Sequence, residues 1–288
     1  MQISASSIAL SGHSFSVACD AIASAGFAFI EPAFIPGYAL FSEDELTPSN
    51  AARLLHLAQA SGLECRSLSA HVDLGAESAV DATIRRLVFA GELGASYLIG
   101  NAAAEGREEA FARNVEAIAP KAEQYGVTIC VENPGHGTSV FRSASDMICW
   151  KEKFDHPSID LNYDTGNVFT ANDEAVDLRD DISIIAGSAA HYHLKDVLSD
   201  QQGWQMCPTG AGSVPIGEML RILADRQPDA PICVEMPLRL RRPNRGPATF
   251  LEPVSVPDAV AALSQSHQFI AEHFTSSRRT SAASNGDT

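Results

Sequence analysis

The hexapeptide ICVENP, at residues 129–134, recurs almost unchanged as ICVEMP at residues 232–237. Each copy runs apolar, β-forming residues directly into a glutamate, Glu132 or Glu235, and a proline ends the run. A short apolar run that stops at a breaker predicts a buried β-strand. A carboxylate at the end of such a strand is costly to bury unless a partner compensates its charge. The repeat therefore predicts two buried strands whose glutamates share one partner.

The composition is that of a globular protein with a sizeable core. The chain has 288 residues, 45% of them hydrophobic, which is enough for one large α/β barrel or two ordinary domains. No apolar run approaches the roughly 18 residues needed to span a bilayer. The first Lys or Arg is Arg53, so the start lacks the basic segment of a signal peptide. The net charge of −16 argues against a nucleic-acid partner. We therefore expect a cytoplasmic protein that binds neither membranes nor nucleic acids.

Short apolar runs alternate with segments of helical period over most of the sequence. The predicted strands are 3–8, 27–31, 64–70, 97–101, 128–132, 159–164, 190–194 and 232–235. The predicted helices include 50–61, 81–93, 107–125, 173–186, 216–225 and 257–274. Eight strands, each followed by a helix, predict a (β/α)₈ TIM barrel that forms one catalytic domain over residues 1–274. The last residues, 275–288, are small and polar, which predicts a disordered tail.

Polar side chains stand at the ends of the last four predicted strands: Glu132, Asp164, His193 and Glu235. In a TIM barrel these carboxyl ends meet at one mouth, where catalytic residues gather. Three carboxylates and an imidazole at one point would repel and desolvate one another without a cation. One divalent metal supplies it, and the donor set suits Mn²⁺, Mg²⁺ or Co²⁺ better than a thiolate-preferring metal, with Zn²⁺ left open.

Four segments in this order, VENPG (131–135), DTGN (164–167), HLKD (193–196) and VEMP (234–237), resemble the xylose-isomerase-like TIM-barrel superfamily. That superfamily includes D-tagatose 3-epimerase-type ketose epimerases, hydroxypyruvate isomerase and inosose dehydratase. The resemblance implies a metal site made by the four strand-end residues and proton transfer by its two glutamates. It also implies a homodimer or homotetramer. Endonuclease IV belongs to the same superfamily, but the loop TGAGSVPIGE (209–218) lacks the Asp-x-His of its larger metal site.

Such a site favours proton transfer next to a carbonyl group, because a bound metal stabilises an enediolate as a Lewis acid. Two glutamates on opposite faces of a substrate would epimerise it, whereas one base on one face would give an aldose–ketose isomerisation. We therefore expect an isomerase or epimerase of a sugar, sugar acid or sugar phosphate. A lyase stays open, since the same enediolate can expel hydroxide or arise by loss of CO₂. A non-catalytic sugar-binding barrel is the third possibility, and the two proton-transfer glutamates argue against it.

The expected substrate contacts are His71, Asn167, Lys195, Asp196, Arg239 and Arg241. Asn167 takes the place at which many epimerases of the superfamily carry a histidine. The stretch PLRLRRPNRG (237–246) places four arginines directly after the last strand, where barrels often bind anions. In so acidic a chain this cluster predicts an anionic carbohydrate substrate. The roles of Glu31 and His136 stay open between substrate contact and structural support, whereas His191, two residues before His193, is expected to lie deeper and to support the site.

Overall fold

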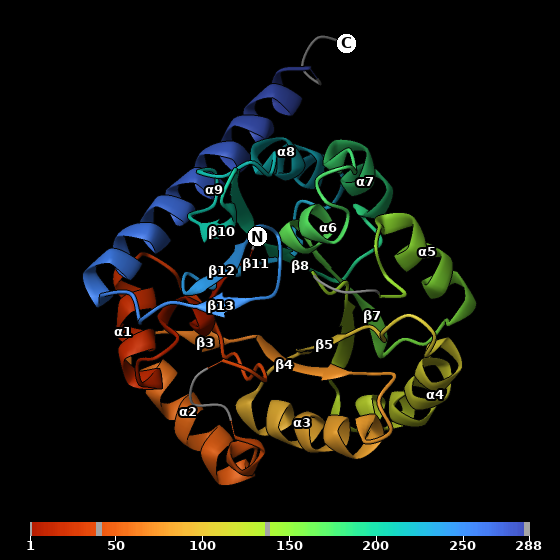
Figure 1. The fold of residues 1–288 in the computed structure, drawn as a ribbon. Helices are drawn as coiled ribbons and strands as arrows, with labels where there is room; N and C mark the ends of the chain where they lie inside the picture. Colours follow the sequence, from red (N-terminus) through yellow and green to blue (C-terminus); the bar gives the residue numbers. More distant parts are fainter. Residues whose placement is uncertain (1, 39–41, 136–138, 285–288) are drawn as a thin grey trace.

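The computed structural model describes residues 2–38, 42–135 and 139–284, which form a parallel barrel inside a ring of helices (Figure 1). The barrel strands are β1 (Gln2–Ser6), β2 (Phe29–Glu31), β3 (Glu64–Cys65), β4 (Ser67–Asp73), β5 (Tyr97–Asn101), β6 (Thr128–Glu132), β7 (Ile159–Asp164), β8 (His191–Leu194) and β11 (Pro231–Val234). They are hydrogen-bonded in the order β3-β2-β1-β11-β8-β7-β6-β5-β4.

The third predicted strand is interrupted at Arg66, which separates β3 from β4. β3 pairs with β2, and β4 pairs with β5, so this one interrupted strand occupies the seam of the barrel. A further parallel bridge joins Ala33 to Ser69 across the same seam. The strands thus occupy eight positions around a nearly closed barrel, which confirms the predicted TIM-barrel fold.

The helices are α1 (Phe15–Ser24), α2 (Pro48–Ala60), α3 (Ala79–Leu93), α4 (Glu108–Tyr125), α5 (Ala144–Lys153), α6 (Thr165–Ala171), α7 (Leu178–Ile185), α8 (Ile216–Arg226) and α9 (Val256–Ser284), with 3₁₀ helices η1 (Ser7–Leu10) and η2 (Glu43–Glu45). Capping residues determine where several of these helices begin or end. Thr47 caps α2 by accepting a hydrogen bond from the Asn50 N–H, and Pro48 takes a first-turn position. Gly94 and Gly126 end α3 and α4 in the left-handed conformation that glycine favours.

The prediction of one helix over 173–186 is wrong in extent. Asp173 and Glu174 have φ values of 48° and 68°, which stop a helix, and α7 begins only at Leu178. The helix α9 continues to Ser284, and residues 285–288 of the predicted disordered tail lie outside the described residues. The domain boundary at residue 274 stays a prediction. Among the described helices, none has the length and apolar character needed to cross a membrane.

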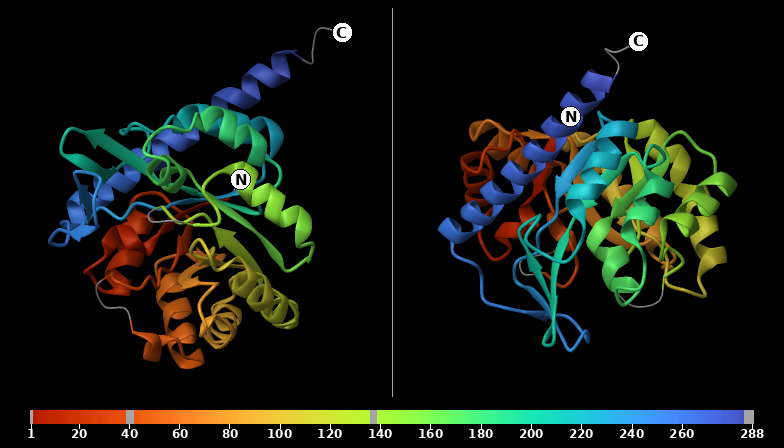
Figure 2. Two further views of the ribbon diagram at one scale, coloured as in Figure 1. Left: turned by 45° about the vertical axis from the view of Figure 1, so that its right-hand side comes forward. Right: turned by 90° about the horizontal axis from the view of Figure 1, so that it is seen from above.

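A second, antiparallel sheet extends from the carboxyl end of the barrel (Figure 2). Its strands are β9 (Asp196–Asp200), β10 (Gly203–Cys207), β12 (Leu240–Pro243) and β13 (Thr249–Phe250), in the order β13-β12-β10-β9. Only Lys195 separates β8 from β9, and β12 follows soon after β11. Because β8 and β11 are neighbours in the barrel, the second sheet stands over one side of the barrel mouth.

Candidate metal centre and active site

Four adjacent barrel strands bring Glu132, Asp164, His193 and Glu235 together. The first two end β6 and β7, His193 lies in β8, and Glu235 directly follows β11. One possible ligand atom of each lies within 4.8 Å of those of the other three, and all four side chains are buried. The strand-end residues singled out in the sequence therefore form one cluster, which we call the four-residue cluster.

The cluster contains carboxylate oxygens that need a positive partner. Within the described part of the chain, Glu132 Oε2, Asp164 Oδ2 and Glu235 Oε2 are buried without a hydrogen bond of regular geometry, although the last two are ion-paired with Lys195. His193 Nδ1 lies 3.9 Å from Asp164 Oδ2 and 3.8 Å from Glu235 Oε2. Buried carboxylate oxygens without full hydrogen bonding are costly, and a divalent cation in the cluster would contact all three at once. The donor set of three carboxylates and one imidazole therefore fits an ion of the Mn²⁺, Mg²⁺ or Co²⁺ class.

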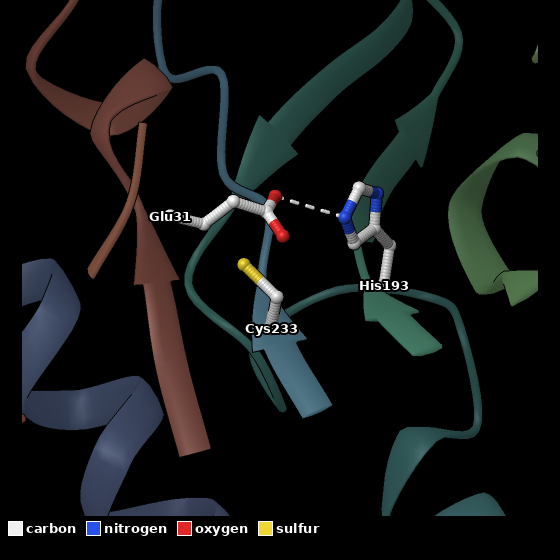
Figure 3. A group of neighbouring side chains, drawn as sticks. All are labelled: Glu31, His193 and Cys233. Carbon is white, nitrogen blue, oxygen red and sulfur yellow. Dashed lines mark hydrogen bonds and ion pairs between the residues drawn. The ribbon is translucent and has the colours of Figure 1, made fainter. Parts of the chain in front are cut away.

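Glu31, at the end of β2, faces the Nε2 edge of His193 (Figure 3), whereas Glu132 contacts Nδ1 on the other edge of the ring. Its Oε1 is 3.0 Å from His193 Nε2, and its Oε2 accepts a 2.5 Å hydrogen bond from Ser67. His191 Nε2 is 3.6 Å from the same carboxylate, and Cys233 completes a second compact group. Because both Glu31 oxygens are engaged, this group is better suited to orient His193 than to hold an ion.

The ionisable groups of the cluster shift one another's pKa values. Burial would lower the pKa of His193, but Glu31 and the cluster glutamates raise it well above its usual range. Burial raises the pKa of Asp164 to about 8, with Lys195 opposing and Glu235 adding to the effect. Burial would also raise the pKa of Glu235, but the Lys195 ammonium lowers it. The three carboxyl groups of the cluster thus share two neighbouring cations, His193 and Lys195, in a buried volume where each charge strongly affects the others.

Lys195 reaches into the cluster from the junction of β8 and β9. Its Nζ lies 2.9 Å from Asp164 Oδ2 and forms an ion pair with Glu235. It also donates a 2.9 Å hydrogen bond to Asn167 Oδ1, while Asn167 Nδ2 donates to the Asn133 carbonyl. The ordinary expectation for this residue is a solvated loop lysine, but its side chain is only 10% exposed. Asn167 and Lys195 therefore belong to one buried network with the cluster.

Asp164 has a structural task besides facing the cluster. Its Oδ1 accepts a 2.7 Å hydrogen bond from the Asn167 N–H and caps α6, while its Oδ2 points to Lys195. Asn133 clamps the same residue by accepting from the Asp164 N–H at 2.8 Å and donating to its carbonyl at 3.0 Å. Both motifs therefore fix Asp164, through Asn133 of VENPG and Asn167 of DTGN, whereas Glu132 accepts a 2.9 Å hydrogen bond from Asn162.

A cavity of about 130 Å³ opens onto the cluster. Its polar lining includes Tyr38, His71, Asn101, Glu132, Asn167, Lys195, Glu235 and Arg242, and its apolar lining includes Ile35, Met206 and Leu240. His71 Nε2 lies 3.4 Å from Glu132 Oε2 and 2.9 Å from the Ser69 hydroxyl. A second cavity of about 320 Å³ between η1, α1 and α2 shares Ile35 and Tyr38 but contains no cluster residue.

Asp196, a predicted substrate contact, is not part of the cavity lining. Its carboxylate accepts hydrogen bonds from the backbone N–H groups of Gly210, Gly212 and Val214 at 2.8, 2.9 and 3.2 Å. Asp196 thus folds the loop that follows β10. The strand-end position of Asp196 was visible in the sequence, but the direction of its side chain was not.

Of the four arginines in the arginine-rich stretch, Arg242 lines the cavity. Arg239 and Arg241, the two arginines predicted to contact substrate, are not among the lining residues. Arg239 donates to the Leu251 carbonyl at 2.7 Å, and Arg241 donates to Gln205. The register of β12 decides this, because alternate side chains of a strand face opposite sides. His136 lies outside the described residues.

Comparisons with known proteins agree with this architecture. The family model of the xylose isomerase-like TIM barrel matches residues 19–258. Similar solved structures include an L-ribulose 3-epimerase, with a TM-score of 0.74 and 17% identity over 100% of this chain and 99% of that one. D-psicose 3-epimerase from Clostridium cellulolyticum H10 gives a TM-score of 0.70 at 16% identity over 94% and 99% of the two chains.

A third similar structure is the probable 3-DHS dehydratase involved in petrobactin synthesis from Bacillus anthracis, with a TM-score of 0.69 and 15% identity over 94% of this chain and 99% of that one. A comparison of sequences with curated proteins finds no match. At identities this low, the structural likeness shows a shared fold and leaves the reaction to be argued from the site.

Proposed function

Because the chain belongs to the xylose isomerase-like TIM-barrel family, we propose that it is a divalent-metal-dependent isomerase or epimerase of a small hydroxylated carbonyl compound. The observation that carries this proposal is the position of the two glutamates. Glu132 and Glu235 stand on the outer two of four adjacent strands, and Asp164 and His193 stand between them. A cation held by all four, with Mn²⁺ the first choice, would act as a Lewis acid on neighbouring substrate oxygens.

The two glutamates are the proton carriers in this proposal. Since they border the cluster on two sides, one carboxylate can remove a proton from the carbon beside the carbonyl and the other can return it. The intermediate is an enediolate, and return on the opposite face gives the epimer. His71, beside Glu132 Oε2, and Lys195, beside Glu235, are placed to hold substrate hydroxyls while the proton moves.

A lyase is the second candidate, and the buried Lys195 favours it. Loss of hydroxide from an enediolate requires a proton at the departing oxygen, and the Lys195 ammonium stands in the cavity between Asp164 and Glu235. The similarity to the fold of a probable dehydratase is a second reason to test for a lyase reaction. Both candidates begin with the same proton removal, so one experiment addresses them together.

The test is to incubate Mn²⁺-reconstituted protein in D₂O with ketoses, aldoses, sugar phosphates and oxo sugar acids, and to record mass spectra. Deuterium gained at carbon with no other change of mass supports the isomerase or epimerase. Loss of water or CO₂ supports the lyase instead. If no compound of the panel exchanged hydrogen or changed mass, the proposed proton transfer would be contradicted.

Glu132→Gln and Glu235→Gln should each lower the exchange rate by about 10²–10⁴-fold, because each removes a general acid–base group. Glu116→Gln is the matched control, since Glu116 is exposed on α4, and it should exchange at the wild-type rate. Circular dichroism and metal content should be measured for each variant, so that loss of the fold or of the ion is separated from loss of the proton carrier. A near-wild-type rate for either cluster variant would exclude that glutamate as an essential carrier.

A further inference from the structure

The arginine-rich stretch after β11 contains one arginine whose charge the described chain does not compensate. Three of its four arginines are engaged elsewhere, namely Arg239 with the Leu251 carbonyl, Arg241 with Gln205 and Arg245 with Glu174. For Arg242, the described residues provide neither an ion pair nor a side-chain hydrogen bond. It is half-buried and lines the same cavity as Lys195 and Glu235.

The second sheet fixes the direction of Arg242. It lies opposite Trp204 in the antiparallel pairing of β12 with β10, and Trp204 is buried. Burial lowers the pKa of the Arg242 guanidinium, and Tyr38, another cavity residue, opposes this shift. A guanidinium stays charged at physiological pH, so a half-buried one without an anion is costly. An anionic group of a bound molecule would remove that cost.

We propose that Arg242 binds a carboxylate of the substrate, and that the enzyme therefore acts on an oxo sugar acid and not on a neutral sugar. The inference rests on the proposed function, because it takes this cavity as the substrate site. One planar guanidinium matches one carboxylate through two parallel hydrogen bonds. A phosphate dianion calls for more donors, and Lys195, the other Lys or Arg among the described residues of the cavity lining, is already paired with Asp164 and Glu235. The uncompensated guanidinium and the small cavity thus favour a carboxylate.

Three probes that differ only at carbon 6 test this assignment: D-fructose, D-fructuronate and D-fructose 6-phosphate. Their dissociation constants for the Mn²⁺-reconstituted protein are measured by titration calorimetry. D-fructuronate should bind most tightly. Arg242→Met should raise its dissociation constant about 10- to 100-fold, because a charge-assisted double hydrogen bond is lost. The same substitution should leave the constant for D-fructose unchanged.

Two further variants separate binding from mere loss of structure. Arg242→Lys keeps the charge but loses the planar fork, so it should recover only part of the affinity for D-fructuronate. Arg245→Met is the matched control from the same stretch, since Arg245 pairs with Glu174 outside the cavity, and it should bind like the wild type. Equal weakening of D-fructose and D-fructuronate by Arg242→Met would overturn the proposal. So would tightest binding of D-fructose 6-phosphate, or no measurable binding of D-fructuronate.

Mass spectra in D₂O keep this inference distinct from the proposed function. If D-fructuronate binds through Arg242 but neither exchanges hydrogen nor changes mass, the carboxylate site stands and the proton-transfer proposal fails for this substrate. If D-fructose exchanges as fast as D-fructuronate in both the wild type and Arg242→Met, the proton-transfer proposal stands and the carboxylate inference is overturned.

Discussion

A single residue, Glu31, determines which nitrogen of His193 faces the four-residue cluster. The Glu31 carboxylate is fully buried and lies 3.0 Å from His193 Nε2. His193 Nδ1 lies on the other edge of the ring, 2.7 Å from Glu132 Oε1. With Nε2 donating to Glu31, Nδ1 is the nitrogen that a cation in the cluster would bind. A carboxylate behind a metal-binding histidine also raises the basicity of that histidine. Glu31 is therefore a positioning residue, which acts through His193 without touching the substrate.

Glu31→Gln should weaken Mn²⁺ binding by about 10- to 100-fold, the usual effect of removing such a partner. Glutamine keeps the size of the side chain but removes the negative charge that holds the His193 tautomer. Titration calorimetry gives the affinity, and the visible absorption of the Co²⁺-loaded protein reports the ligand geometry.

Cys233→Ser is the control for this experiment, because Cys233 belongs to the same buried group and serine keeps a small hydrogen-bonding side chain without adding charge. It should bind Mn²⁺ nearly as tightly as the wild type. An unchanged affinity together with an unchanged Co²⁺ spectrum in Glu31→Gln would show that Glu31 does not position His193.

The sequence predicted the cluster residues because their signal is local: each stands where a buried strand meets the barrel mouth. The same reasoning left Glu31 undecided between a sugar contact and a salt bridge. Its role depends on the neighbouring strands, which place Ser67 and His193 beside its two oxygens. Arg242 could not be separated from Arg239 and Arg241 for a related reason, since the register of β12 is set by a distant partner strand.

At the scale of elements, the start of α6 and the end of β8 form one unit. The Thr165 hydroxyl donates to the Lys195 carbonyl at 2.9 Å and accepts from the Lys195 N–H at 3.1 Å. Gly166 lies directly against this residue, and a Cβ there would be 2.8 Å from both Cγ and the carbonyl oxygen of Lys195. The glycine of DTGN thus allows the close approach that brings Lys195 into the cavity.

Gly166→Ala should lower the free energy of unfolding by about 1–3 kcal/mol, the usual cost of overpacking a buried position. It should also lower turnover, because the backbone at Lys195 must move to admit the methyl group. Chemical denaturation and the D₂O exchange assay measure the two effects.

Gly91→Ala provides the comparison. Gly91 is an exposed residue of α3, and a Cβ added there would meet no neighbouring atom within 4 Å. Alanine at this position should therefore stabilise the protein by about 0.5–1 kcal/mol. Wild-type stability and turnover in Gly166→Ala would refute the argument that the contact with Lys195 is tight.

The second sheet is the largest part of the fold that the sequence did not predict. One reason is a weak local apolar signal, and another is a pairing between strands that lie far apart in the chain. β9 has only two buried residues followed by exposed or half-exposed ones, so it lacks the apolar run that marks a barrel strand. β12 pairs with β10 across a long stretch of chain that includes α8 and β11. Such a pairing depends on the completed barrel, whereas each barrel strand carries its own apolar signal.

At the scale of the whole molecule, the four-residue cluster joins parts of the chain from Glu132 to Glu235. A cation bound there would bridge β6, β7, β8 and the end of β11, and so would connect strands that are otherwise joined only by sheet pairing and helices. The unfolded chain cannot present these four side chains together. Binding therefore favours the folded state by mass action.

Removal of divalent metal by a chelator should consequently lower the melting temperature. At a free Mn²⁺ concentration of 100 times the dissociation constant, binding adds about 2.7 kcal/mol to the folded state. For a chain of this size each kcal/mol corresponds to about 2–4 °C, so the expected difference is roughly 5–10 °C. Differential scanning calorimetry of chelated and Mn²⁺-reconstituted protein measures it.

The Glu132→Gln/Glu235→Gln double variant decides whether this stabilisation comes from the cluster. It removes two of the three carboxylates that would hold the ion, so its melting temperature should no longer depend on Mn²⁺. Its metal-free form should melt below the temperature of the metal-free wild type, since Lys195 loses its ion pair with Glu235 and His193 loses its contact with Glu132. If the melting temperature of the variant still rose by several degrees with Mn²⁺, the stabilising ion would bind elsewhere. The four-residue cluster would then not be the metal centre.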